Sequence, residues 1–241
     1  MGRAVAGLAL KDSAFAVAAA VEAPGHLAIG QDYGTVLGQP APLGVRVSGE
    51  AKAAIGQGDV VIEFTTPEVT AAHVQLVQAQ RKPIVVGTTG LSDAQLEALR
   101  AASKTIPIVF SPNMSVGVNV LFELAQAAAQ RLGPAYDVEI VESHHRQKKD
   151  APSGTAKRLA EVLAAARRQP SGSIPVHAVR AGDIVGDHTV IFAGPAERLE
   201  LTHCAQSREV FAQGALRAAQ FLVSQPPGLY DMSHVLRGRA S

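Results

Sequence analysis

The chain has 241 residues, of which 47% are hydrophobic, so it can bury a substantial core as one large domain or two smaller ones. Its 22 basic and 21 acidic residues give a formal charge of +1, which excludes the global basic excess typical of proteins that bind nucleic acids or anionic membranes. Cys204 is the only cysteine, so an intrachain disulfide is excluded, and no apolar run reaches the ~18 residues of a membrane span, which together favour a cytoplasmic protein.

Strand and helix patterns alternate through the first half of the chain. Helical patterns cover residues 4–10, 67–80 and 92–102. Apolar segments typical of buried parallel strands lie at residues 15–21, 59–64, 83–86 and 106–110. This alternation predicts a doubly wound, Rossmann-like α/β domain with a parallel sheet, which we place at residues 1–115 as the dinucleotide-binding domain.

The pattern changes after residue 115. Helices are predicted near residues 117–131, from 153 to about 167, and over 207–223, with strands at 138–141, 175–180, 188–192 and 198–202. The last three strands follow one another without long intervening helices, which predicts a smaller α+β domain with a mixed sheet at residues 116–215. We expect residues 216–241 to pack back onto the first domain.

Residues 142–156 combine two adjacent histidines, a basic cluster and a helix start. Ser153, Gly154 and Thr155 precede an apolar helical repeat, and the unpaired N–H groups of a first helical turn can hold a carboxylate or phosphate. Gly154 would let an anion approach the backbone closely. Proton donors and positive charge lie just upstream, at His144, His145, Arg146, Lys148 and Lys149. This segment predicts a pocket for an anionic small molecule with an acid beside it, although basic runs are usually solvated loops and histidine pairs are often surface residues.

Three expected strand ends carry residues suited to a nucleotide. In open α/β sheets, ligands bind outside the carboxyl ends of the strands. Glu22 could accept hydrogen bonds from ribose hydroxyls, and the turns at 87–90 and 111–114 could expose backbone amides. The alternative is that their glycine, proline and asparagine residues simply make tight turns.

The motif Glu-x-His-His-x-x-Lys-x-Asp-Ala-Pro-Ser-Gly-Thr-Ala is met at residues 142–156. Through this motif the chain resembles the 4-hydroxy-tetrahydrodipicolinate reductase family, long called dihydrodipicolinate reductase. Further matches follow in the family's order, at residues 61–68, 85–90, 113–119, 180–189 and 228–232. The resemblance implies reduction of a cyclic, unsaturated dicarboxylate imine by NADH or NADPH in lysine and diaminopimelate biosynthesis. It also implies a homotetramer built through the sheets of the second domain.

The resemblance also implies roles for individual residues. His144 matches the family's proton donor and Lys148 its second catalytic residue, and histidine suits acid–base work because its ordinary pKa is about 6.5. The substrate-binding positions are matched by His145, Ser153, Gly154 and Thr155. The cofactor-binding positions are matched by Glu22 at the ribose and by two loops, Gly87, Thr88, Thr89 and Ser111, Pro112, Asn113, Met114.

Two departures from the family pattern matter. Members often place an arginine after the ribose-contacting acid, where it meets the 2′-phosphate of NADPH. Here Ala23 follows Glu22, and no lysine or arginine occurs until Arg46, so we expect a preference for NADH. The chain also begins Met1-Gly2-Arg3, at the last residues of the family's first-strand signature. We expect translation to start upstream, because a chain without that strand would lack most of the glycines that hold the pyrophosphate.

Two alternatives remain open. One is another two-domain nicotinamide dehydrogenase, such as one acting on an amino acid, and the match at residues 142–156 weighs against it. The other is a truncated, non-catalytic oligomeric or ligand-binding homologue, against which the retention of His144 and Lys148 argues. We expect no metal, because adjacent histidines alone do not make a tetrahedral site.

Overall fold

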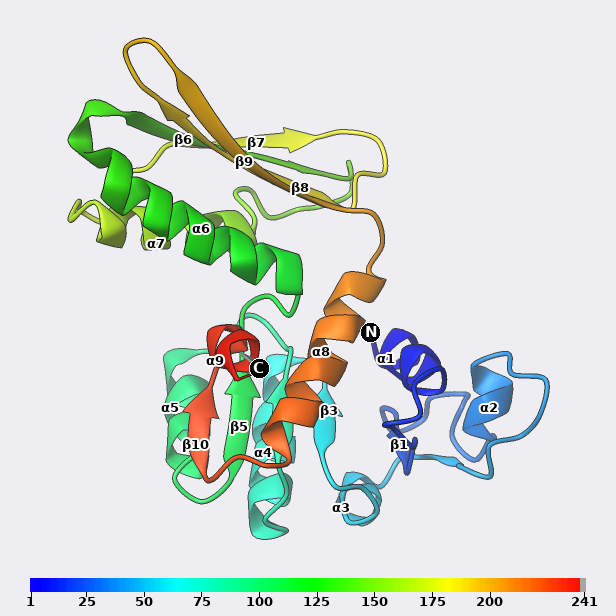
Figure 1. Cartoon of the computed structure of the whole chain (residues 1–241). Coiled ribbons are helices and arrows are strands. Elements are labelled where there is room, and N and C mark those ends of the chain that lie inside the picture. Colours follow the sequence, from blue (N-terminus) through cyan, green and yellow to red (C-terminus); the bar gives the residue numbers. More distant parts are fainter. Residues whose placement is uncertain (239–241) are drawn as a thin grey trace. The chain divides into compact units, whose positions relative to one another are not determined.

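The computed structural model describes residues 1–238, and the chain divides into two compact units (Figure 1). One unit contains residues 1–111 and 212–238, and the other contains residues 112–211. The boundaries therefore follow residues 111 and 211, whereas the sequence placed them after residues 115 and 215. The predicted fold class is confirmed, since one unit has parallel sheets covered by helices and the other has a mixed sheet.

All strand pairs of the first unit are parallel. Its strands are β1 (Ala20–Val21), β2 (Val47–Ser48), β3 (Val61–Glu63), β4 (Ile84–Val86), β5 (Pro107–Phe110) and β10 (Gly228–Tyr230). Four of them form a sheet of order β10-β5-β4-β3, and β1 pairs with β2 in a separate sheet. Strand β4 is fully buried, as expected for a central parallel strand with both faces covered.

The helices of the first unit have recognisable starts. Its helices are α1 (Gly2–Ala9), α2 (Tyr33–Val36), α3 (Ala51–Ile55), α4 (Pro67–Ala79), α5 (Asp93–Ala102), most of α8 (Glu209–Leu222) and α9 (Met232–Arg237). Helix α4 begins with a proline, and α5 begins with a capping box between Ser92 and Gln95. In Figure 1, α8 lies across one face of the four-stranded sheet while α5 lies behind it.

The second unit is a four-stranded sheet with two long helices on one face (Figure 1). Its elements are α6 (Val116–Leu132), a short 3-10 turn (Gly133–Ala135), β6 (Asp137–His144), α7 (Gly154–Ala166), β7 (Val176–Arg180), β8 (Gly186–Ala193) and β9 (Arg198–Ala205). The strand order is β7-β6-β8-β9, with β6 and β7 parallel and the other pairs antiparallel.

Strand β6 continues beyond the predicted end at residue 141. Its buried residues alternate with partly exposed ones, as the two-residue period of a strand requires, and the buried row begins with Val138 and Ile140. The same row continues through Glu142 to His144, because residues 142–144 still pair with β7 on one side and, as far as Ser143, with β8 on the other. The strand therefore carries apolar side chains into the core at one end and polar side chains into a buried cluster at the other.

The sequence did not predict several short elements. Strands β2 and β10 have only two and three residues, too few for a periodic pattern, and β10 is positioned by its parallel pairing with β5 from more than 100 residues earlier in the chain. Helices α2, α3 and α9 have four to six residues and were missed for the same reason.

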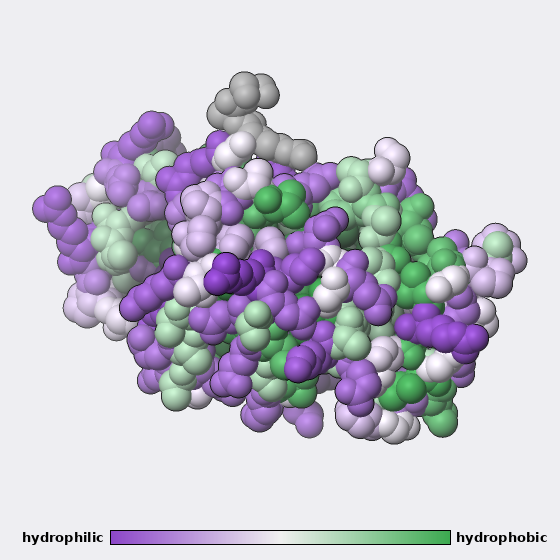
Figure 2. Space-filling view, turned by 90° about the horizontal axis from the view of Figure 1, so that it is seen from below, coloured by the Kyte–Doolittle hydropathy of each residue, from purple (hydrophilic) through white to green (hydrophobic). Residues whose placement is uncertain are grey.

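Figure 2 shows hydrophilic residues over much of the face it displays, with smaller hydrophobic areas between them. None of the helices within residues 1–238 is long and apolar enough to cross a bilayer.

Candidate functional site

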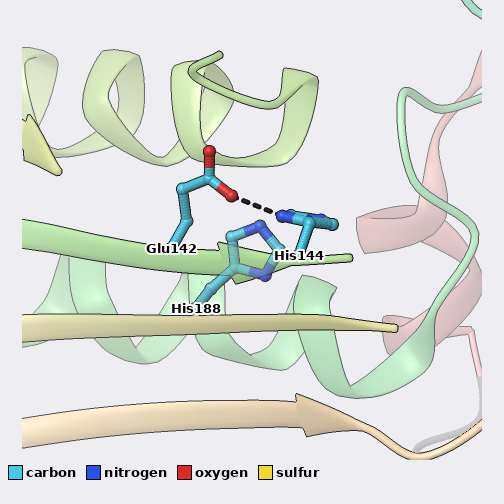
Figure 3. Close-up of side chains that lie close together, drawn as sticks. All are labelled: Glu142, His144 and His188. Carbon is cyan, nitrogen blue, oxygen red and sulfur yellow. Dashed lines mark hydrogen bonds and ion pairs between the residues drawn. The ribbon is translucent and has the colours of Figure 1, made fainter. Parts of the chain in front are cut away.

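The centre of the candidate site is the side chain of Glu142, which is completely buried. The Arg180 guanidinium donates one hydrogen bond to each carboxylate oxygen, at 2.7 and 3.0 Å. The backbone N–H of Ser153 donates a third, at 3.1 Å. A fourth joins the carboxylate to Nδ1 of His144, and Figure 3 shows these two side chains pointing toward each other, with His188 beside them.

These contacts determine the charges of Glu142 and His144. Burial raises the pKa of the Glu142 carboxyl, but the hydrogen bonds from Arg180, His144 and Ser153 outweigh burial and lower the pKa below its ordinary value. Glu142 is therefore an ionised carboxylate at neutral pH. Burial lowers the pKa of His144, and the charges of Lys148 and Arg180 lower it further, although the hydrogen bond to Glu142 opposes them. The ligand-free imidazole is thus mostly neutral at pH 7.

His188, from β8, lies against the imidazole of His144 on the same side of the sheet. The two rings meet edge to face, with centroids 5.3 Å apart. Nε2 of His188 is 3.2 Å from the hydroxyl of Ser153, which also accepts a hydrogen bond from the N–H of Ala156 and so caps α7. Burial, and then the nearby His144, lower the pKa of His188 to about 4. His188 is therefore a neutral group that supports the start of the helix.

Glu142, His144 and His188 bring possible metal ligands within 4.8 Å of one another. Their surroundings disfavour a cation, however. Arg180 already occupies both carboxylate oxygens, and the charge of Lys148 acts on both histidines. A metal would have to displace the guanidinium, so this cluster suits an anionic ligand better than a metal ion.

The loop between β6 and α7 carries the other predicted catalytic and substrate-binding residues. Lys148 is partly buried, and its ammonium donates to the carboxylate of Asp150 at 2.8 Å. The hydrogen bond from Lys148 lowers the pKa of Asp150. His145 is half-buried, with Nδ1 3.1 Å from the side-chain oxygen of Gln147. Arg180 also donates to the backbone carbonyl of Asp150 at 2.7 Å, so the same guanidinium contacts both Glu142 and this loop.

The start of α7 has the form expected of an anion site. Gly154 is the first helical residue and is exposed, and a Cβ built on it would meet nothing within 4 Å. Neither the fold nor a positive φ requires glycine here, and the open space would let a ligand approach the backbone closely. The hydroxyl of Thr155 accepts a hydrogen bond from the side chain of Asn113 at 2.9 Å. This bond links a predicted cofactor residue to a predicted substrate residue within the second unit.

The other members of the second predicted cofactor loop differ in how far they are buried. Met114 is buried, and its side chain is part of the core rather than of an open surface. Pro112 is exposed, and Ser111 is buried at the end of β5. Asn113 also accepts from the N–H of Ser115 at 2.8 Å, which fixes its side chain at the start of α6.

The first predicted cofactor loop follows β4. Gly87 continues the ladder by donating to the carbonyl of Glu63, and a Cβ on it would lie 2.1 Å from the ring of Phe64, so only glycine fits. Thr89 is exposed. The side chain of Thr88 points inward, because its hydroxyl accepts hydrogen bonds from the N–H of Thr65 and the hydroxyl of Thr70. Any contact from Thr88 to a cofactor would therefore use its backbone.

Beneath this loop lies a buried acid that the sequence did not single out. The carboxylate of Glu63 at the end of β3 accepts hydrogen bonds from Thr65 and Thr70, and Nδ1 of His73 on α4 lies 2.6 Å from it. These groups connect the ends of β3 and β4 through Thr88. Glu22 follows β1 and is exposed, and its carboxylate accepts a hydrogen bond from the N–H of Ala23 at 2.9 Å.

The sequence patterns assign no role to Glu142, Arg180 or His188, although all three lie within segments that match the family. The sequence does contain one usable signal. Glu142 and His144 lie two residues apart after Val138 and Ile140, so a longer strand would have placed both on the buried face. A buried acid needs a cationic partner, but the identity of that partner depends on the pairing of β6 with β7.

Similar chains are found among known proteins. The chain is 47% identical to the 4-hydroxy-tetrahydrodipicolinate reductase of Anaeromyxobacter sp. (strain Fw109-5), with 100% of this chain and 95% of that protein covered. It is 45% identical to the protein of the same name from Magnetococcus marinus, with 98% and 94% covered.

Solved structures agree. Dipicolinate-bound dihydrodipicolinate reductase from Paenisporosarcina sp. TG-14 superposes with a TM-score of 0.77 at 26% identity, over 95% of this chain and 92% of that one. An amine dehydrogenase from Mycobacterium smegmatis, at 14% identity and a TM-score of 0.64 over 95% and 91% of the two chains, shares the fold.

Two family descriptions together account for nearly the whole chain. Residues 1–114 match "Dihydrodipicolinate reductase, N-terminus", and residues 117–236 match "Dihydrodipicolinate reductase, C-terminus". The resemblance drawn from the sequence is thereby confirmed, and the chain belongs to the dihydrodipicolinate reductase family.

Proposed function

We propose that this chain catalyses the reaction for which its relatives are named, the NADH- or NADPH-dependent reduction of 4-hydroxy-tetrahydrodipicolinate to tetrahydrodipicolinate. The observation that carries this proposal is the cluster of His144, Lys148 and the start of α7 in a full-length match to the family. A buried acid–base residue, a cation and unpaired helix N–H groups are the parts that an anionic substrate and a protonation step require.

The substrate would be held through its carboxylates. The exposed first turn of α7 at Gly154 and Thr155 would bind one carboxylate, and the cationic side chain of Lys148 would bind negative charge nearby. In the ligand-free chain Lys148 donates to the exposed carboxylate of Asp150, which a substrate carboxylate would replace. His145 and Ser153 complete this proposed substrate site.

His144 would donate the proton. When bound, the nicotinamide cofactor would supply a hydride to the conjugated imine, and the negative charge that develops on the substrate must then be protonated. Nδ1 of His144 is held by Glu142, which leaves Nε2 as the nitrogen that can donate to the substrate. A bound dianion beside the imidazole would raise the pKa of His144, so substrate binding would itself charge the acid.

The cofactor would lie along the carboxyl ends of the parallel strands of the first unit. Glu22 after β1, Gly87–Thr89 after β4 and Ser111 after β5 all occupy such ends, which is where nucleotides bind in sheets of this class. Asn113, Pro112 and Met114 follow directly after Ser111. These residues fit the ribose and nicotinamide ends of a dinucleotide, with the backbone of Thr88 and the exposed Thr89 nearest the strand end.

The preference for NADH over NADPH is part of this proposal. Glu22 is exposed at the end of β1, where a carboxylate favours a 2′-hydroxyl and repels a 2′-phosphate. Arg46 donates to the carbonyl of Gly30 and is thus engaged in the fold. Against this preference, Arg3 lines a cavity of about 440 Å³ with His26, and both Arg3 and Glu22 are close enough to Tyr33 for their charges to act on it.

A homotetramer in the cytoplasm completes the proposal. The sheet of the second unit is covered by α6 and α7 on one face only (Figure 1), and the other face carries partly exposed residues such as Val141, Thr189 and Ile191. Strand β7 adds Val179, an exposed valine, to the same face. This face mixes exposed apolar side chains with polar ones, a composition suited to pairing with a second copy.

His144→Gln should lower kcat by roughly 10²–10⁴-fold, because the transition state loses its proton donor. Lys148→Met should raise KM for the substrate and also lower kcat. The assay follows NADH oxidation with substrate generated in situ by the preceding synthase. His177→Gln changes an exposed histidine of the same sheet and should match the unchanged chain. Wild-type kcat in His144→Gln, or a folded wild-type chain without activity, would overturn the proposal.

Gly154→Ala should raise KM for the substrate about tenfold or more, because the added methyl group keeps a carboxylate from the helix N–H groups, and a charge-assisted hydrogen bond contributes about 1.5–3 kcal/mol. Thermal stability should be unchanged or slightly higher, since the Cβ meets no protein atom within 4 Å and alanine favours helix. An unchanged KM in a stable variant would place the carboxylate elsewhere.

Binding of dipicolinate, an unreactive dicarboxylate, should take up protons near pH 7. The pKa of His144 lies below its ordinary value in the free chain, and the ligand's negative charge raises it, so protons move onto the protein. Calorimetry in buffers of different ionisation enthalpy measures the uptake, which His144→Gln should abolish. Equal uptake in that variant would show that another group is protonated.

The ratio of kcat/KM for NADH to that for NADPH should favour NADH by about tenfold, the equivalent of 1.4 kcal/mol. Glu22→Gln should bring the ratio closer to one, whereas Glu50→Gln, an exposed glutamate that follows β2, should leave it unchanged. Equal or better efficiency with NADPH would contradict the preference. If Arg3→Ala then lost activity with NADPH but kept activity with NADH, Arg3 would be the residue that binds the 2′-phosphate.

A further inference from the structure

Arg180 makes contacts that join three separate segments. It ends β7, and its guanidinium donates to both carboxylate oxygens of Glu142 on β6. The same group donates at 2.7 Å to the carbonyl of Asp150, in the loop that carries Lys148. Only 18% of the Arg180 side chain and none of the Glu142 side chain is exposed, so water screens their attraction weakly.

The carboxylate in turn determines which nitrogen of His144 carries a proton. An ionised carboxylate can only accept hydrogen bonds, so the His144 nitrogen that contacts it, Nδ1, must carry a hydrogen in every protonation state of the ring. The exchangeable proton is then on Nε2. That nitrogen lies beside Gly186 on β8, where a Cβ would come within 3.0 Å of it. The backbone of β8 thus leaves just enough room for the ring in this orientation.

We propose that Glu142 and Arg180 act as a positioning pair for His144, in which the guanidinium keeps the carboxylate ionised and fixed, and the carboxylate holds the imidazole with Nε2 as its only exchangeable nitrogen. This inference rests on the proposed role of His144 as proton donor. It assigns a function to two residues that would not touch the reacting atoms. It also makes the two members of the pair act in opposite directions on the proton affinity of the ring.

The opposite directions follow from the charges that face His144. Among the charged groups of residues 1–238 that act most strongly on His144, the anion Glu142 strengthens the binding of a proton to the ring, whereas Arg180 and Lys148 weaken it. His188, which packs against the ring from β8, is neutral near pH 7. Removing Glu142 therefore lowers the proton affinity of His144, and removing Arg180 raises it. A residue that only maintained the fold would not produce shifts of opposite sign.

The test is the pH dependence of kcat/KM, which falls as pH rises through the pKa of the free acid. In Glu142→Gln this descending limb should move to lower pH, and in Arg180→Met to higher pH. A shift of one pH unit would appear as about a tenfold change at a pH above the limb. In the double variant Glu142→Gln/Arg180→Met the limb should return toward its original position, since the two charge changes compensate.

Two further variants separate positioning from folding. Arg180→Lys keeps the charge but not the two-pronged contact, so its limb should stay near the original pH while kcat falls. Glu139→Gln removes an exposed carboxylate that contacts His177 across the same two strands, and it should change neither limb nor kcat. Shifts of the same sign in Glu142→Gln and Arg180→Met, or no shift in folded variants, would overturn the inference.

Nuclear magnetic resonance titration of the His144 ring nitrogens gives a readout that does not need turnover. The free chain should show Nδ1–H at every pH and a titrating Nε2, with the midpoint lowered in Glu142→Gln and raised in Arg180→Met. A neutral ring protonated on Nε2 instead would overturn the inference even in an active enzyme. The expected titrations in a chain without reductase activity would support the pair and reject the proposed function.

Discussion

The buried carboxylate of Glu142 is the group on which the polar end of the second unit depends. An ionised carboxylate that is removed from water costs several kcal/mol unless donors replace its hydration. Here the donors are the Arg180 guanidinium, the Ser153 N–H and the His144 ring. They come from β7, from the start of α7 and from β6 itself. The charge is therefore satisfied only when two strands have paired and the helix has docked.

This requirement couples the fold to the site. Strand β6 has one buried face, and it supplies Val138 and Ile140 to the core and then Glu142 and His144 to the polar cluster. Helix α7 also joins the polar cluster to the core. Its start contacts Glu142, and its later turns bury Leu159 and Leu163 completely. Apolar packing at one end thus fixes the orientation of the polar groups at the other. A histidine placed on a strand in this way needs no separate loop to hold it.

The sequence was sufficient for the longer elements and for the local part of the site. Helices α4, α5 and α7 and strands β4 and β5 lie within two residues of their predicted positions, because their apolar periods are long or their flanking residues are clear. His144, Lys148 and Gly154 were predicted together as site residues because they share one motif.

Arg180 could not be found in the same way, since it lies 38 residues from Glu142 and reaches it only through the pairing of β6 with β7. The inward turn of Thr88 was missed for a related reason. Its partners, Thr65 and Thr70, lie before and within a helix whose packing on the sheet no local pattern reveals. Sequence patterns specify elements and near neighbours, whereas long-range hydrogen bonds depend on how strands pair.

The charges around His144 also bear on its proposed role as an acid rather than as a permanent cation. A lone buried carboxylate beside the ring would hold it as an imidazolium, and the proton would then be harder to release. A lone guanidinium would keep the ring neutral and leave no proton to give. With both groups present, their effects on the pKa of His144 oppose each other. Burial then decides the shift, and the pKa of His144 lies below its ordinary value. The negative charge of a dicarboxylate can then raise it, so that the acid becomes charged when its substrate is in place.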